Sequence, residues 1–170
     1  MNQRKALFIA ISFVIGFSFG SFFKVAYEAI VFDAYAWDSP PIILNCYGED
    51  FEELQLVRAI EYWALRGHEI AFYEMSPSDS ACKEDSLRGF IVLKKTPRNK
   101  MDGSSLAVTR RSTQGTKIIN ATIHFNPGAH NLTNIIEHEL GHAFGYGHID
   151  IEGHIMHPEY EKMGSKFWIP

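Results

Sequence analysis

Positive charge and cysteine are both scarce in this 170-residue sequence. Sixteen Lys and Arg residues are outnumbered by twenty Asp and Glu, so the formal net charge is −4, and nothing suggests a nucleic acid as a partner. Cys46 and Cys82 are the only cysteines. In an oxidising compartment they could form one bridge, although two separate thiols fit the sequence nearly as well. The sequence has no acidic loop pattern typical of a calcium site, so no calcium ion is assigned.

A long uncharged run is present, and it lies near the N-terminus. Residues 6–23 follow Arg4 and Lys5 and, as a helix, would cover roughly 27 Å of a hydrocarbon core of about 30 Å. The length favours an uncleaved signal anchor that crosses a membrane once, with a cytoplasmic N-terminus and an extracytoplasmic remainder. A signal peptide cleaved before Ser21 is the alternative and would make the protein secreted. The adjacent cations argue against a buried core helix.

The Pro40-Pro41 pair divides the chain into two parts. Residues 1–39 are expected to form the anchor and a short stalk, and residues 40–170 one globular domain. Apolar residues at three-to-four spacing predict a helix over 51–66, which Gly67 ends. Residues rich in β-formers predict strands at 42–44, 70–73, 89–93, 106–110 and 118–125, the last two joined by a hairpin turn at 112–115.

The stretch 138–148 has the sequence HELGHAFGYGH. If it begins as a helix, His138 and His142 lie four residues apart on one face, near enough to chelate one ion. Glu139 is rotated by about 100° around that helix, so it is better placed to bind a water than to ligate the metal. The helix has two candidate N-terminal caps, Asn131 and Thr133.

The third histidine of the stretch, His148, would lie on the wrong side of a continuous helix. Gly145 and Gly147 allow the helix to stop and the chain to double back, which brings His148 to the same ion. Three neutral imidazoles leave the fourth position of a tetrahedral zinc open, as in catalytic sites. We therefore expect one Zn²⁺ on His138, His142 and His148, with Glu139 as the general base.

This pattern resembles the metzincin metallopeptidase signature, HExxHxxGxxH followed by a Met-turn. Met156, in Ile-Met-His-Pro, lies eight residues after His148. The sequence of this segment is most similar to that of the matrixin branch. The resemblance implies an α+β zincin domain with a mixed, twisted sheet, two main helices and a Met-turn, preceded by the membrane helix. It also implies that Met156 forms an apolar floor beneath the ligands.

The resemblance further implies a zinc-dependent endopeptidase that hydrolyses peptide bonds of proteins outside the cytoplasm, through a zinc-bound water activated by Glu139. Its partners would be a protein or peptide substrate and the membrane. By resemblance, a substrate pairs with the strand at 106–110. The candidate substrate-binding residues are Leu106, Ala107, Val108 and Thr109.

One departure from the matrixin pattern keeps an alternative open. Twelve residues follow Pro158, where matrixins continue into a further helix. A catalytically weak or inactive zinc-containing module, binding peptides or serving a structural role on a membrane anchor, is therefore the second hypothesis. The intact Glu139 argues against it. Four other histidines are expected to be surface residues or satisfied, partly buried residues rather than ligands: His68, His124, His130 and His154. No role is assigned to His157.

Overall fold

A computed structural model describes residues 36–84, 86–97 and 105–168 of the chain. The predicted membrane segment at 6–23 and most of the predicted stalk lie outside these residues. Within the described ranges, no helix is both long and apolar enough to cross a membrane.

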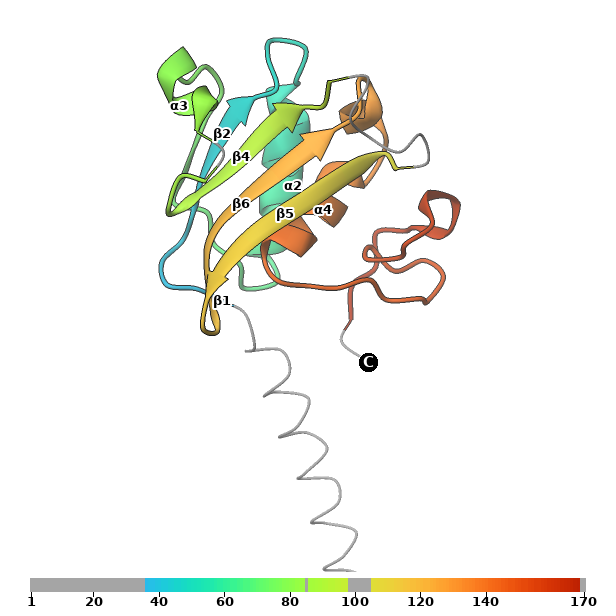
Figure 1. Ribbon diagram of the computed structural model, residues 1–170. Helices are drawn as coiled ribbons and strands as arrows, with labels where there is room; N and C mark the ends of the chain where they lie inside the picture. Colours follow the sequence, from blue (N-terminus) through green and yellow to red (C-terminus); the bar gives the residue numbers. More distant parts are fainter. Residues whose placement is uncertain (1–35, 85, 98–104, 169–170) are drawn as a thin grey trace, which may run out of the picture. The chain divides into compact units, whose positions relative to one another are not determined.

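A single mixed sheet forms the frame of the domain. Its strands are β1 (Ala36–Trp37), β2 (Ile42–Cys46), β3 (Phe72–Glu74), β4 (Phe90–Lys95), β5 (Ala107–Gln114) and β6 (Lys117–Phe125). Neighbouring strands are parallel along the order β3, β2, β4, β6. β1 pairs in parallel with the start of β6, and β5 pairs antiparallel with β6. Figure 1 shows β5 in yellow at the edge of the sheet.

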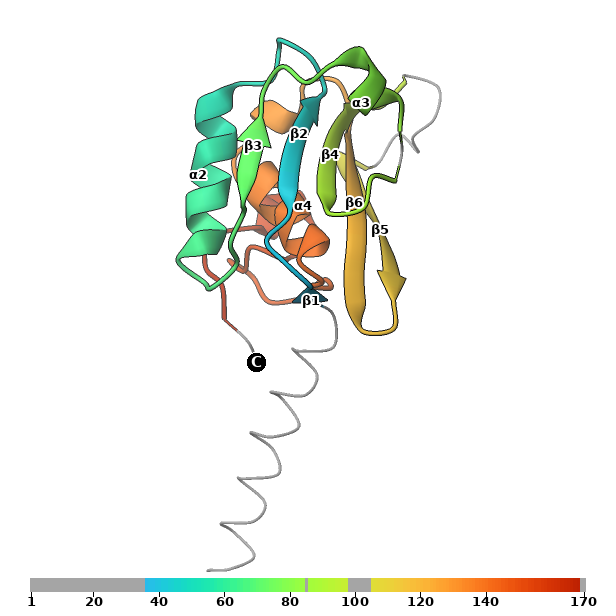
Figure 2. The same cartoon turned by 90° about the vertical axis from the view of Figure 1, so that its left-hand side faces the viewer.

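Two longer helices pack together on one face of this sheet. The helical elements are α2 (Glu53–Ala64), α3 (Asp79–Lys83), η1 (Ala129–Asn131), α4 (Ile135–Ala143) and η2 (Tyr160–Lys162). Figures 1 and 2 show α2 and α4 on the same side, with α4 behind β5 and β6 in the first view. One buried cluster joins the sheet to both helices, because Ile91 and Ile123 belong to the same core as Trp63 and Leu140.

The predicted elements are present, with shifted ends. The 51–66 helix is confirmed as α2, and each of the five predicted strands is confirmed. The hairpin is also confirmed, but β5 continues to Gln114 and the turn follows at Gly115, which has a φ of +61°. Ala36 and Trp37, which the sequence reading placed in the stalk, pair with β6 and belong to the sheet. The boundary at residue 40 stays a prediction.

One local expectation needs correction. The predicted caps Asn131 and Thr133 are wrong, since the residue before α4 is Asn134, with a φ of 67° and no side-chain capping bond. The segment around Cys82 contains the short helix α3, whose N-cap Ser78 accepts a hydrogen bond from the Ala81 amide. Cys82 forms a disulfide with Cys46, which decides between the two alternatives.

Candidate metal centre

The site is built from α4 and the turn that follows it. α4 ends at Ala143, and Gly145 adopts a φ of +109°, a conformation that suits glycine. The amide of Tyr146 then donates 3.0 Å back to the carbonyl of Gly141. The chain therefore reverses where the sequence predicted, and it returns His148 to the helix. Gly145 supplies the left-handed residue, while Gly147 is not among the glycines with positive φ.

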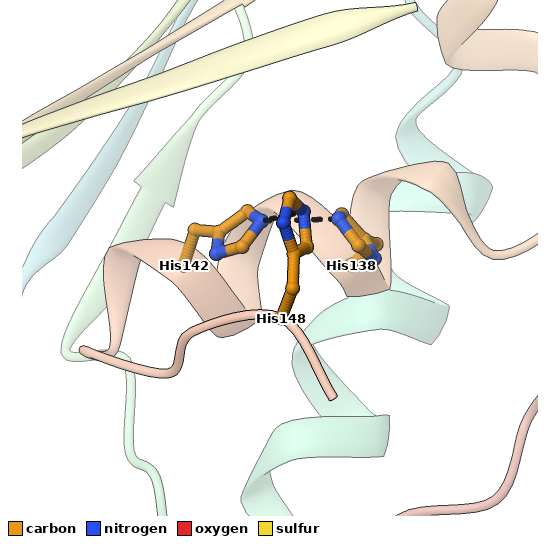
Figure 3. A group of neighbouring side chains, drawn as sticks. All are labelled: His138, His142 and His148. Atoms are coloured by element: carbon orange, nitrogen blue, oxygen red, sulfur yellow. Dashed lines mark hydrogen bonds between the residues drawn. The ribbon is translucent and has the colours of Figure 1, made fainter. Parts of the chain in front are cut away.

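The three predicted histidines converge on one point. The Nε2 atom of His142 lies 3.0 Å from Nε2 of His138 and 3.1 Å from Nε2 of His148. Figure 3 shows the rings of His138, His142 and His148 with these nitrogens turned toward one another. Among the residues that the structure describes, this is the only group of three or more His, Cys, Asp or Glu side chains close enough to share a metal ion.

Backbone carbonyls fix the orientation of two of the rings. Nδ1 of His138 donates to the carbonyl of Ile155 and Nδ1 of His142 to that of Tyr146, each over 2.8 Å. The Nε2 atoms of both rings are then unprotonated and carry lone pairs that face each other. Burial lowers the pKa of His138 to about 4 and that of His142 to about 3, so both imidazoles are neutral near pH 7.

This donor set fits zinc. Facing lone pairs about 3 Å apart repel each other unless a cation lies between them. Zinc–nitrogen bonds of about 2.0–2.1 Å in a tetrahedron would separate the ligand nitrogens by roughly 3.3 Å, close to the 3.0 and 3.1 Å found here. Three imidazoles, two of which donate from Nδ1 to a backbone carbonyl, are typical of a zinc site with outer hydrogen bonds in place.

Glu139 lies beside the three imidazoles and is almost inaccessible to solvent. Its exposed fraction is 5%, and this burial raises the pKa of its carboxyl group to about 7, while the hydrogen bond from Thr109 acts in the opposite direction. The Thr109 hydroxyl donates 2.5 Å to Oε2 of Glu139. Thr109, predicted only as a substrate-binding residue, therefore also orients the candidate base.

A cleft of about 950 Å³ passes over this cluster. All three histidines, Glu139 and the four candidate substrate-binding residues of the 106–109 segment line it. Another wall comes from the segment after the Met-turn, through Pro158, Glu159, Tyr160, Glu161 and Met163. Leu132 and Ile135, near the start of α4, complete the lining. The candidate substrate-binding residues and the candidate catalytic residues thus share one cavity, although their roles stay predictions.

Met156 lies beneath α4, the helix that carries two of the candidate ligands. Its side chain is fully buried, in the same core cluster as Trp63 and Leu140. A Cβ atom added to Gly141 would lie 2.6 Å from Cζ2 of Trp63 and less than 3.0 Å from Sδ of Met156. The glycine inside the motif is therefore required because Met156 and Trp63 approach the helix backbone closely. No local pattern in the sequence indicates this requirement.

Three side chains missed by the sequence reading bind the carbonyls of α4. The indole of Trp63 donates 2.7 Å to Glu137, and the indole of Trp37 donates 3.0 Å to Ala143. Arg111 donates 2.6 Å to His142. The carbonyls of His142 and Ala143 are among the last four of α4, which lack regular partners within the helix, whereas that of Glu137 lies in its first turn. The three donors hold α4 from α2, β1 and β5. The only prior signal was that a buried tryptophan N–H usually needs an acceptor.

The other histidines do not join the cluster, as expected. His154 is fully buried rather than partly buried, and its Nδ1 accepts 2.9 Å from the amide of Met156. Its Nε2–H then donates 2.9 Å to the carbonyl of Trp168, which fastens the C-terminal segment to the Met-turn. His157, buried beside Met156, lies 3.1 Å from Asp150 through Nε2.

The comparison with protein families agrees with this geometry. A family model described as Matrixin matches residues 53–169, which include α2, the metal cluster and the Met-turn. A comparison with curated proteins gives no match.

Proposed function

The chain belongs to the matrixin family of zinc metallopeptidases, and we propose that it is an endopeptidase that cleaves peptide bonds within proteins outside the cytoplasm. One observation carries the proposal. The Nε2 atoms of three neutral imidazoles meet beside a buried carboxylate, in a cleft bordered by an edge strand. Zinc held by His138, His142 and His148 would acidify a water molecule and polarise the carbonyl of the scissile bond.

Glu139 is the proposed general base. Its position beside the histidines allows it to accept the proton of the attacking water and then deliver that proton to the leaving amine. The carboxyl group must be ionised for the first step, and the hydrogen bond from Thr109 favours the ionised form. The same bond restricts the carboxylate to one orientation. Thr109 is therefore proposed as a positioning residue for the base.

β5 is the proposed binding strand for the substrate backbone. In the described part of the chain β5 pairs only with β6, so its other edge can accept an extended peptide. Leu106, Ala107, Val108 and Thr109 all line the cleft along this edge. A peptide added there would run past Glu139 and the three histidines. Backbone pairing would make binding tolerant of sequence, while the walls of the cleft select side chains.

The domain is proposed to lie outside the cytoplasm on a single membrane anchor. The uncharged run at 6–23 after Arg4 and Lys5 supports the anchor. The Cys46–Cys82 disulfide supports an oxidising compartment, since such bonds are rare in the cytosol. The full chain should stay in the membrane pellet after alkaline carbonate extraction, with the domain accessible to external protease. A soluble species that begins at Ser21 would instead show a cleaved signal peptide and a secreted enzyme.

The second candidate is a zinc-containing peptide-binding module without activity. Among the described residues after Met156, the only helical element is the 3₁₀ turn η2. This segment still provides a wall of the cleft through Pro158, Tyr160 and Met163. The described residues after Met156 thus still line the cleft, and the intact Glu139 beside the three histidines supports the peptidase over the binding module.

The test uses the full chain in detergent with an unstructured protein as substrate. The peptidase should produce internal fragments, lose activity on chelation and regain it when zinc is restored. His148→Ala should weaken zinc binding as much as His138→Ala or His142→Ala, because all three are proposed as ligands. Tight peptide binding without any cleavage by the zinc-loaded protein would support the binding module instead.

A further inference from the structure

We infer that Arg111 makes this peptidase select substrates with an acidic residue on the N-terminal side of the scissile bond. This inference rests on the proposed function and specifies the substrate class of the same cleft. It is carried by the position of Arg111 on β5, by the charges of the cleft lining and by the direction in which a peptide would pair.

The alternation of β5 directs Arg111 into the cleft and its neighbour away from it. Successive side chains on a strand point to opposite faces of the sheet. Thr109 faces α4, since its hydroxyl bonds to Glu139, and Arg111 faces α4 too, since its guanidinium bonds to His142. Arg111 lines the cleft and Arg110 does not. The chain therefore supplies two adjacent exposed arginines, of which Arg111 lines the cleft and Arg110 does not.

β5 and α4 run in the same direction along the cleft. Thr109 contacts Glu139, and two residues later Arg111 contacts His142, three residues further along α4. Leu106 lies just before β5, Leu132 and Ile135 lie before and at the start of α4, and all three line the cleft. One end of the cleft is therefore apolar and the other carries the positive charge of Arg111, with the candidate catalytic residues between them.

The direction of pairing decides which half of the substrate meets Arg111. Antiparallel pairing is more stable per residue than parallel pairing, so a peptide on β5 would run from the Arg111 end toward the Leu106 end. Its N-terminal half then lies beside Arg111. Two residues of strand span about 6.6–6.8 Å, which places Arg111 within reach of the first three positions before the scissile bond.

The charge of Arg111 is distinctive in its surroundings. Among the described residues that line the cleft, Arg111 is the only Lys or Arg, and the acidic residues are Glu139, Glu159 and Glu161. The Arg111 side chain is exposed, and its bond to His142 holds the guanidinium at the cleft. A guanidinium stays charged at all relevant pH values and pairs with carboxylates through a planar fork. An acidic substrate side chain is thus attracted at this end, whereas Glu159 and Glu161 disfavour it at the opposite wall.

The experiment compares quenched peptides that differ at one position only. Ala, Asp or Lys is placed at each of the three positions before, and each of the three positions after, a fixed cleavage site. The wild-type chain should cleave the best Asp peptide about threefold to thirtyfold faster than the matching Lys peptide in kcat/KM, at a position before the bond. Because the contact is exposed, this ratio should shrink as salt increases.

Variants assign the preference to one side chain. Arg111→Glu should reverse the ratio, Arg111→Lys should retain part of it, and Arg110→Glu should leave it unchanged. Arg110→Glu makes the same change in net charge one residue away, so it controls for long-range electrostatics. Zinc content per chain is measured for each variant because Arg111 also bonds to the carbonyl of His142.

Each outcome has a defined meaning. A zinc-loaded wild-type chain that cleaves none of the peptides would contradict the proposed function. Cleavage of all peptides with equal Asp and Lys rates, a preference confined to positions after the bond, or a preference unchanged in Arg111→Glu would overturn the inference alone. If Arg111→Glu does not fold, the wild-type ratio, its salt dependence and the Arg111→Lys variant still decide.

Discussion

Nδ1 of His138 donates a 2.8 Å hydrogen bond to the carbonyl of Ile155, the residue before Met156. The ring of one candidate ligand is therefore oriented by the Met-turn, seventeen residues later in the chain. On the same helix, the absence of a side chain at Gly141 allows Met156 to pack against the backbone. The Met-turn and the ligand-bearing helix thus form one unit, and a change in their packing should disturb metal binding as well as stability.

Gly141→Ala tests this packing. The added methyl group would overlap with Met156 and Trp63, and overpacking of a core typically costs about 1–3 kcal/mol, more than the roughly 1 kcal/mol that alanine gains over glycine in a helix. We expect a lower free energy of unfolding in urea and weaker zinc binding. Gly147→Ala is the control, because nothing lies within 4 Å of a Cβ at that position. Equal effects of the two substitutions would contradict the packing argument.

Thr109→Val tests the orientation of the base. Valine has nearly the same shape as threonine but cannot donate to Oε2 of Glu139. We expect kcat to fall about tenfold, the order expected when a hydrogen bond to a charged group is lost, with zinc content unchanged. Thr113→Val removes a hydroxyl from the exposed part of the same strand and should leave kcat near the wild-type value. A normal kcat in Thr109→Val would mean that the hydroxyl does not position Glu139.

The disulfide should stabilise the fold without contributing to the metal site. Cys46 and Cys82 are 36 residues apart, and closing a loop of that length stabilises a protein by about 3–4 kcal/mol in the chain-entropy account. The double variant Cys46→Ala, Cys82→Ala should unfold at a lower urea concentration and still bind one zinc. Loss of zinc binding in the folded double variant would show that the bridge also shapes the site.

The sequence predicted the parts of this structure that depend on local pattern. Apolar spacing gave the α2 helix, and the fixed intervals between His138, His142 and His148 gave the metal cluster, because both follow from the geometry of a few consecutive turns. The contacts that hold the cluster depend on distant residues. Trp63, Trp37 and Arg111 reach α4 from three other elements, and no local periodicity specifies which carbonyl each one binds.

The helix start shows the same limit at short range. Asn131 and Thr133 have good capping side chains, yet α4 begins after Asn134 in the left-handed conformation. Residues 129–131 are instead engaged in the 3₁₀ turn η1, where the Asn131 amide donates to the carbonyl of Gly128. Packing of this turn against the core, through the buried Ala129 and His130, overrides the capping preference.

The measurement that tests the central claim most directly is peptide hydrolysis by Glu139→Gln at matched zinc occupancy. Gln keeps the size and polarity of the side chain but removes its basicity, so the three histidines should still hold about one zinc per chain. General-base catalysis typically contributes ~10²- to 10⁴-fold, and cleavage of a quenched peptide should fall by at least that range. A rate equal to that of the wild-type chain, with zinc in place, would contradict the assignment of Glu139 as the base.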